Sequence, residues 1–245
     1  MPIKAEPRIT AWSYSRLQVY KQCPFKCRMA HLPWNGQRVK EPEGPAVVRG
    51  KVIETEVLDY LFGAKDAKLP ESGARFPTEL AILKKMRSRV RSKVKLGFNR
   101  AWKVVDYFAP DVWTRMEFDL IFEDLLPGQK KHYRAHIIDL KTGKIYPDKF
   151  DQFELYNLVA LILPEDIITH KPELSFAEGW YLDQGEIAGE TTLMKSDIAK
   201  QIKRWEKEAD KLLSETAWQP RPNNMCRFCF YRKDNKASGG GQCPY

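Results

Sequence analysis

Two extended segments joined by a short turn constrain the fold of this chain more than any other feature. Between residues 113 and 123, apolar and polar side chains alternate, the pattern of a strand buried on one face. One face carries Met116, Phe118, Leu120 and Phe122, and the other carries Arg115, Glu117, Asp119 and Ile121. A second extended segment runs from Tyr133 to Lys141, and Pro127-Gly128 between them is a turn signal. The two segments are therefore predicted to form a β-hairpin.

The second strand ends in a carboxylate and a lysine that share a face. Asp139 and Lys141 are two residues apart, and such residues point the same way from a strand. A carboxylate binds Mg²⁺ through oxygen, the metal polarises a phosphodiester and acidifies a water, and a lysine offsets the developing negative charge. Asp-x-Lys alone is commonly a surface ion pair. Asp119 on the neighbouring strand and Glu54 on a preceding helix could supply further oxygens, which favours a metal site.

The other segments mix helical and extended patterns. Ser13 can cap a helix that ends near Pro24, and a second helix from about Arg49 carries Ile53, Val57 and Leu61 on one face. Further expected elements are a loop over 35–49, helices over 150–163 and 196–212, and strands over 176–182 and 190–193.

A basic stretch from Glu79 to Lys103 is predicted to be a helix. Its apolar residues recur every four positions, at Ile82, Met86, Val90 and Val94. The rest of its surface is basic, and like charges without acids between them repel one another. A solvated helix face is the ordinary explanation. Nearby phosphates would relieve the repulsion, and we expect Arg87, Arg91 and Lys95, one turn apart, to line a path for DNA.

Charge and cysteine content narrow the class of protein. The 41 Lys and Arg residues exceed the 32 Asp and Glu residues, and the resulting charge of +9 favours polyanionic partners. No apolar run approaches the roughly 20 residues of a membrane span, and the N-terminus has no signal core. We therefore expect a cytoplasmic protein with no membrane partner, whose five cysteines are metal ligands or thiols more readily than disulfides.

Several segments, in this order, resemble the motifs of RecB-like nucleases of the PD-(D/E)XK superfamily. They are residues 49–54, 117–119, 138–143 and 152–156, preceded by Ser13-x-Ser15-x-Leu17-x-x-Tyr20-x-x-Cys23-Pro24, which resembles that family's N-terminal signature. The resemblance implies an α/β fold of mixed α+β type, with a central mixed β-sheet flanked by helices on a restriction-endonuclease-like core. It also implies a Mg²⁺ or Mn²⁺ site and cleavage of DNA.

The resemblance assigns roles to individual residues. It implies metal ligation by Asp119, Asp139, Glu54 and the carbonyl of Leu140. Lys141 matches the catalytic lysine, and Gln152 and Tyr156 match a pair that positions the active site or the DNA. Relatives often carry a histidine ligand where this chain has Glu54, and a carboxylate there is a harder ligand able to bind Mg²⁺.

The cysteines resemble those of the four-cysteine nucleases of CRISPR adaptation, an iron-sulfur type. That resemblance implies a 4Fe-4S cluster held by Cys23, Cys226, Cys229 and Cys243, which would join the chain ends. The gap before Cys243 is longer than in relatives, and zinc bound by four cysteines or unligated thiols are the alternatives. Cys27 could replace Cys23 in such a site, but its expected role is that of a small buried side chain. We expect one nuclease domain over 1–245, with a core at about 45–195 and a cysteine-cluster cap from 10–34 and 196–245.

The expected function is a metal-dependent DNA nuclease, an exonuclease acting on DNA ends or single strands in recombination, repair or phage DNA processing. The cytoplasm of a bacterial cell or of a phage-infected host is the expected location. No helicase motif is present, so any motor or recombination partner is a separate chain. The alternative is a non-catalytic nucleic-acid-binding protein with a structural cysteine-bound metal and a decayed site. A small-molecule enzyme is disfavoured because the chain has no Gly-x-Gly-x-x-Gly, P-loop or Ser/His triad.

Overall fold

The computed structural model describes residues 8–126, 128–237 and 240–245. Pro127 of the predicted turn lies outside the described residues, as do residues 1–7 at the N-terminus, where no signal core was expected. Within the described part, the chain forms two compact units. The first comprises Met1–Pro42, Gly97–Met116 and Trp205–Tyr245, and the second comprises Glu43–Leu96 and Glu117–Arg204. Each unit is described by itself below.

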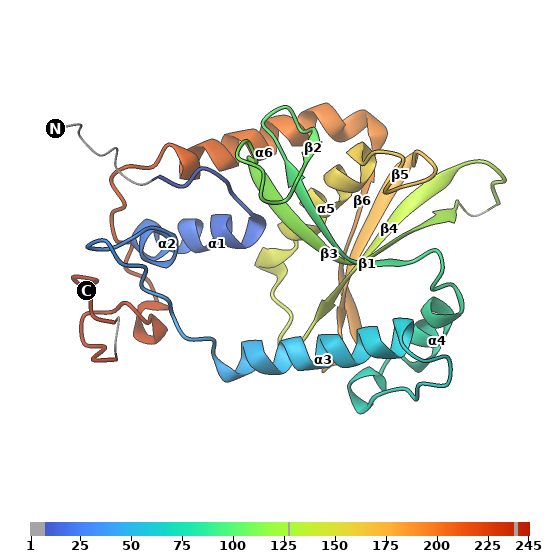
Figure 1. Ribbon diagram of the computed structural model, residues 1–245, viewed down its shortest axis with the longest axis horizontal. Coiled ribbons are helices and arrows are strands. Elements are labelled where there is room, and N and C mark those ends of the chain that lie inside the picture. Colours follow the sequence, from blue (N-terminus) through green and yellow to red (C-terminus); the bar gives the residue numbers. More distant parts are fainter. Residues whose placement is uncertain (1–7, 127, 238–239) are drawn as a thin grey trace. The chain divides into compact units, whose positions relative to one another are not determined.

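The strands form one six-stranded sheet in the order β2-β1-β3-β4-β5-β6 (Figure 1). The strands are β1 Arg91–Phe98, β2 Val104–Val105, β3 Thr114–Leu125, β4 Tyr133–Lys141, β5 Leu174–Tyr181 and β6 Glu186–Met194. The pair β3 and β4 is antiparallel, with Leu120 opposite Ile138, which confirms the predicted hairpin. The pair β4 and β5 is parallel, and β5 and β6 are antiparallel, so the sheet is mixed as expected.

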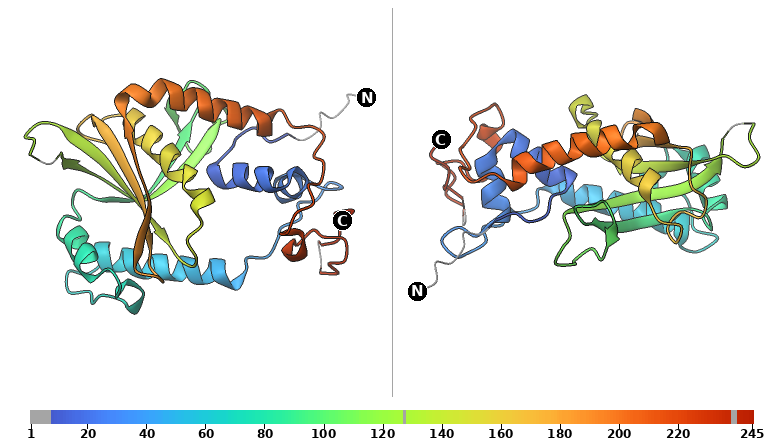
Figure 2. Two further views of the ribbon diagram at one scale, coloured as in Figure 1. Left: turned by 180° about the vertical axis from the view of Figure 1, so that it is seen from behind. Right: turned by 90° about the horizontal axis from the view of Figure 1, so that it is seen from above.

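The second unit places helices on both faces of the sheet (Figures 1 and 2). They are α3 Pro45–Phe62, α4 Pro77–Lys85 and α5 Asp151–Ile162. A parallel strand pair needs a crossover connection, and α5 lies in the crossover from β4 to β5. Short 3₁₀ turns occur at Glu71–Gly73, Pro147–Lys149, Lys195–Asp197 and Cys226–Phe228.

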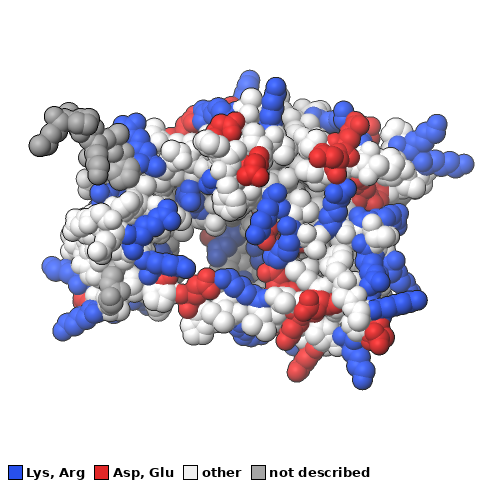
Figure 3. All heavy atoms as spheres, viewed as in Figure 1, with Lys and Arg blue, Asp and Glu red and all other residues white. Residues whose placement is uncertain are grey.

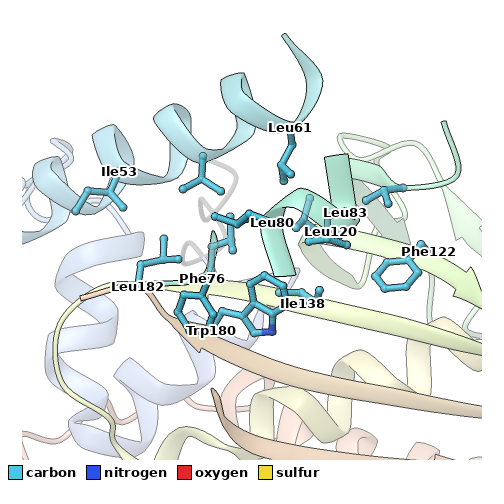
Figure 4. Packing of buried hydrophobic residues seen from close by; sticks show 13 residues of the cluster. Ile53, Leu61, Phe76, Leu80, Leu83, Leu120, Phe122, Ile138, Trp180 and Leu182 are labelled. Carbon is cyan, nitrogen blue, oxygen red and sulfur yellow. The ribbon is translucent and has the colours of Figure 1, made fainter. Parts of the chain in front are cut away.

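Helix α3 is anchored by an apolar stripe at helical spacing. Ile53, Val57 and Leu61 are buried, as the sequence predicts, and Gly63 caps the helix through its N–H to the Asp59 carbonyl oxygen. Figure 4 shows α3 side chains directed toward residues of α4 and of the sheet, Leu120 and Ile138 among them. The cluster under α3 also contains Phe76, Leu80, Leu83, Val90, Phe122, Leu140, Trp180 and Leu182.

Strand β3 departs from the strict alternation predicted between Met116 and Phe122. Leu120 lies in the cluster under α3, whereas the Phe118 ring contacts Tyr156 of α5 at a centroid distance of 5.1 Å. Residues two apart in a regular strand share a face, so the alternation is interrupted between Phe118 and Leu120. The interruption falls at Asp119.

The first unit contains both ends of the described chain. Its helices are α1 Tyr14–Gln22, α2 Pro24–His31 and the second half of α6 Ile198–Leu213. Ser13 caps α1 by accepting a hydrogen bond from the Arg16 N–H at 3.3 Å, which confirms the predicted helix start. None of the helices among the described residues is long and apolar enough to cross a membrane.

The single helix predicted over 79–103 is wrong. Helix α4 ends at Lys85, and the chain continues through a turn into β1 at Arg91. Ile82, predicted to be buried, is 53% exposed. The sequence contained a competing signal, because Val94, Leu96 and Phe98 alternate with polar or small residues, and Gly97 disfavours a helix.

The proposed row of basic residues is therefore not a helical face. Arg87 lies in the turn and donates to the Gly63 carbonyl oxygen at 3.1 Å. Arg91 and Lys95 are exposed residues of β1. Helix α3 begins at Pro45, within the loop predicted over 35–49, and β6 is longer than the strand predicted over 190–193.

Burial of α3 predicts a large stability difference between two positions of this helix. Leu61→Ala should lower the free energy of unfolding by about 2–5 kcal/mol, because Leu61 is fully buried and its loss leaves a cavity. Val52→Ala is the matched control, since Val52 is 53% exposed. The control should change stability by no more than about 0.5 kcal/mol in urea denaturation. Equal effects would contradict the assigned face.

Candidate active site

Four side chains predicted from the sequence form a closed ring of contacts in the second unit. Lys141 on β4 contacts Asp139 Oδ2 through its ammonium and donates to Gln152 Oε1 at 3.3 Å. Gln152 Nε2 donates to the Tyr156 hydroxyl at 2.5 Å, and that hydroxyl donates to Asp139 Oδ1 at 3.4 Å. Each of the four residues is thus held by two others.

Local geometry explains the ring. Asp139 and Lys141 are two apart on β4 and share a face, and Gln152 and Tyr156 are four apart on α5 and share a helical stripe. The aromatic contact between Phe118 and Tyr156 fixes this helix against β3. The crossover therefore places Gln152 and Tyr156 of α5 over the end of β4, where Asp139 and Lys141 lie.

Asp119 joins the ring from the neighbouring strand. Its Oδ2 accepts a hydrogen bond from the backbone N–H of Leu140 at 2.8 Å. This bond ties a side chain of β3 to the backbone of β4 between Asp139 and Lys141. The role of the Leu140 carbonyl as a metal ligand stays a prediction.

Glu54 reaches the same region from α3, and the residue that joins it to Asp119 is Lys93 of β1. The Lys93 ammonium contacts Glu54 Oε1, lies 3.0 Å from Asp119 Oδ1 and lies 3.3 Å from Glu117 Oε1. Sequence reasoning missed Lys93 because it counted the residue among the charges of a helix. The signal that could have found it was the strand-like alternation around Val94.

Burial and neighbouring charges shift the pKa values of three groups in the ring. Burial raises the pKa of Asp139 to about 6, the Lys141 charge opposes this, and the Asp119 charge adds to it. Burial, the largest single cause, lowers the pKa of Lys141, but the charge of Asp139, its hydrogen bond to the ammonium and the charge of Asp119 together outweigh burial, so the pKa is raised. Burial, with the charges of Asp139 and Asp119, raises the pKa of Tyr156 well above its usual value, so its hydroxyl keeps its proton and acts as a donor.

A second set of contacts joins the first motif to the strand that carries Lys141. Arg49 forms two hydrogen bonds to Asp183, at 2.8 and 2.5 Å, and the Gly143 N–H donates to the same carboxylate at 2.7 Å. A Cβ added at Gly50 would lie 3.0 Å from Thr142 Oγ1, so a glycine permits this close approach. The segments 49–54 and 138–143 are thus brought side by side.

The donor atoms can be compared with what a divalent metal needs. Among the described residues, no group of three or more His, Cys, Asp or Glu is placed to hold a metal ion. Glu54, Glu117 and Asp119 nevertheless share one positive charge, because the Lys93 ammonium contacts all three carboxylates. Carboxylate oxygens are the ligands that Mg²⁺ and Mn²⁺ prefer. The chemistry of the donors therefore fits the expected metal.

The cysteines lie in the first unit. Cys23, Cys226, Cys229 and Cys243 line one cavity, which Cys27 does not line. Two backbone N–H groups point at their sulfurs, from Arg221 to Cys23 Sγ at 3.4 Å and from Asn223 to Cys226 Sγ at 3.2 Å. None of the five cysteines, all of which lie within the described residues, forms a disulfide, and Cys27 is buried as expected.

Two of the three basic residues proposed to contact phosphates lie close to acidic side chains. Lys95 Nζ lies 3.9 Å from Glu117 Oε2, at the edge of the acidic cluster formed by Glu54, Glu117 and Asp119. Arg91 lines a surface hollow that also includes Glu123 and Asp124. On the face drawn in Figure 3, basic and acidic side chains are interspersed.

Comparison with known proteins gives the family. The profile of the PD-(D/E)XK nuclease superfamily matches residues 11–233. Among solved structures, SSO0001 is similar at 16% identity over 93% of this chain and 86% of that one, with a TM-score of 0.36. A candidate exonuclease from Eubacterium rectale is similar at 12% identity over 90% and 87%, with a TM-score of 0.45. Among curated proteins none matches. Because the family match extends over most of the sequence, this chain belongs to the PD-(D/E)XK nuclease superfamily.

Proposed function

We propose that this protein is a metal-dependent DNA nuclease. Its active site, formed by Asp119, Asp139 and Lys141, hydrolyses phosphodiester bonds of the DNA. The observation that carries the proposal is the ring in which Lys141 contacts both Asp139 and Gln152, beside Asp119. A structural ion pair needs no such arrangement, because it would be satisfied by one partner. Family membership supports nuclease chemistry at these residues.

The metal would be held by Asp119 and Asp139, with Glu54 and the Leu140 carbonyl as further oxygen ligands. A bound Mg²⁺ or Mn²⁺ supplies polarisation of the phosphate and a water of lowered pKa. The ionised form of Asp139 is the one that binds a cation, and Lys141 favours that form by its positive charge.

Lys141 is the proposed catalytic residue. Its Nζ can orient the attacking water and offset negative charge that builds on the phosphate in the transition state. Gln152 and Tyr156 act as positioning residues, because their hydrogen bonds hold Lys141 and Asp139 in one geometry. Preorganised charges of this kind stabilise a transition state without reorganisation during the reaction.

The substrate we propose is DNA with free ends or single strands, cut by an exonuclease mechanism. The net charge of +9 favours association with a polyanion. Arg87, Arg91 and Lys95 remain proposed phosphate contacts, now on a turn and a strand in place of a helix. Family analogy supports a role in recombination, repair or phage DNA processing in a bacterial or phage-infected cytoplasm, with any helicase on a separate chain.

We also propose that the first unit holds a 4Fe-4S cluster, as in RecB-like nucleases of the iron-sulfur type. The four cysteines that the resemblance singles out line a common cavity. Thiolate sulfur suits both iron-sulfur clusters and zinc, so four-cysteine zinc is the competing occupant. The cluster would join residues near Cys23 to residues near Cys243 and act structurally, as the cap of a single nuclease domain.

Cleavage assays test the proposed centre. Wild-type protein should degrade end-labelled single- or double-stranded DNA with Mg²⁺ or Mn²⁺ and not with EDTA. Lys141→Ala should lower the rate by about 10²–10³-fold or more, because a transition-state charge is lost. Lys144→Ala, three residues further along the chain and exposed, is the matched control and should keep wild-type activity. The product ladder would give the polarity of digestion.

The same assay separates the nuclease from the alternative. Wild-type protein that binds DNA and never cuts it under either metal would establish a nucleic-acid-binding protein with a decayed site. Glu54, the departure from the histidine of relatives, would then be the first residue to examine.

Metal analysis tests the cysteine site. Anaerobically purified protein should be brown and contain iron and sulfide, and Cys226→Ser or Cys243→Ser should lose most of both. Cys27→Ala is the control and should keep them, because Cys27 does not line the cavity. Colourless protein that contains zinc would end the cluster proposal while keeping the site.

Salt dependence tests the proposed phosphate contacts. The double variant Arg91→Gln/Lys95→Gln should flatten the slope of log K against log salt by about one unit per lost phosphate contact. A second double variant, Lys65→Gln/Lys68→Gln, removes two exposed charges from the loop after α3 and should leave the slope unchanged. Identical slopes for all three proteins would show that β1 does not contact DNA.

A further inference from the structure

Lys93 has the contacts of a bound cation. Its ammonium touches Glu54 on α3 together with Glu117 and Asp119 on β3, so one positive charge is shared by carboxylates from two elements. Glu54 Oε1 is buried and accepts no hydrogen bond from the described residues, and its contact is this ion pair. Removal of the ammonium would leave three negative charges close together.

The backbone at Lys93 is held in an unusual conformation. Its φ is +52°, in the left-handed region that side chains other than glycine rarely adopt. Such a residue in a strand redirects its side chain, and strain of this kind persists only where surrounding contacts enforce it. At Lys93 this backbone conformation coincides with the contacts between the ammonium and the three carboxylates.

We propose that Lys93 is an internal counter-cation that occupies the metal position between Glu54 and Asp119 and is displaced when a divalent cation binds. This inference rests on the proposed metal site. A divalent ion held by Glu54 and Asp119 would lie within a few ångströms of the ammonium that contacts both, and like charges at that distance repel. Metal and ammonium therefore compete for the same oxygens.

The geometry allows the exchange without disruption of the core. The Lys93 side chain is 36% exposed, whereas that of Asp119 is 14% exposed. A long flexible side chain can swing into solvent while the carboxylates stay in place. In the metal-free protein Lys93 holds the acidic cluster together, and the metal must overcome this contact before it binds.

Binding of Mn²⁺ alone, without DNA, tests the proposal. Lys93→Met keeps the length of the side chain and removes its charge, and it should bind Mn²⁺ about tenfold more tightly or better in calorimetric titration. Lys65→Met is the matched control, because it removes the same charge from an exposed position in the loop after α3. Its affinity for Mn²⁺ should stay within about threefold of the wild-type value.

Thermal unfolding gives a second readout. Without metal, Lys93→Met should melt below wild-type protein, because the carboxylates lose their counter-charge, and Mn²⁺ should raise its melting temperature by more than it raises that of wild type. Lys93→Gly accommodates the left-handed backbone and serves if the methionine variant does not fold.

An affinity for Mn²⁺ that is unchanged or weaker in both Lys93 variants would overturn the proposal, as would equal gains in Lys93→Met and Lys65→Met. These outcomes differ from failure of the nuclease proposal. Tighter Mn²⁺ binding by a protein that cuts no DNA would leave the exchange standing. DNA cleavage with unchanged Mn²⁺ affinity would remove only the exchange.

Discussion

Burial of the Asp139 carboxylate is the constraint on which the rest of the site depends. A carboxylate taken out of water is costly unless partners compensate its charge, and every partner here comes from a defined place in the fold. Lys141 follows on the same strand, and Tyr156 arrives on the crossover helix. The parallel pairing of β4 with β5 makes that crossover necessary. The ring of contacts therefore depends on the order of the strands in the sheet.

Patterns that act over a few residues made much of this structure predictable. The extended segment that ends at Lys141, the stripe of Ile53, Val57 and Leu61, and the cap at Ser13 each depend on neighbours in the sequence. Contacts between residues far apart in the sequence were harder to predict. Nothing local indicates that Gln152 would meet Lys141, and family resemblance, not chemistry, identified that residue. The interruption of β3 at Asp119 was also hidden, because it depends on packing against two different helices.

The segment after α4 shows how two periodicities can compete. Ile82, Met86 and Val90 fit a helix, and Val94, Leu96 and Phe98 fit a strand, so Val94 satisfied both patterns. The strand forms in place of the helix, because β1 pairs with β2 and β3 in the sheet, whereas an isolated helix would lack these partners. The prediction of a helix hid the role of Lys93, because its side chain lies among the carboxylates only when residues 91–98 form a strand. Charge counted along a sequence does not distinguish a phosphate contact from an internal ion pair.

The division of the chain among its two units has a consequence for biosynthesis. Residues 205–245 of the first unit emerge about 160 residues after Pro42, whereas the second unit is complete at Arg204. At roughly 5–20 residues per second, the apolar side chains of Phe25 and Met29 wait roughly 10–40 s for Tyr231, which is about 200 residues further along the chain and forms a cluster with them. During translation the second unit can therefore fold first, while the early helices remain accessible to chaperones and to premature aggregation.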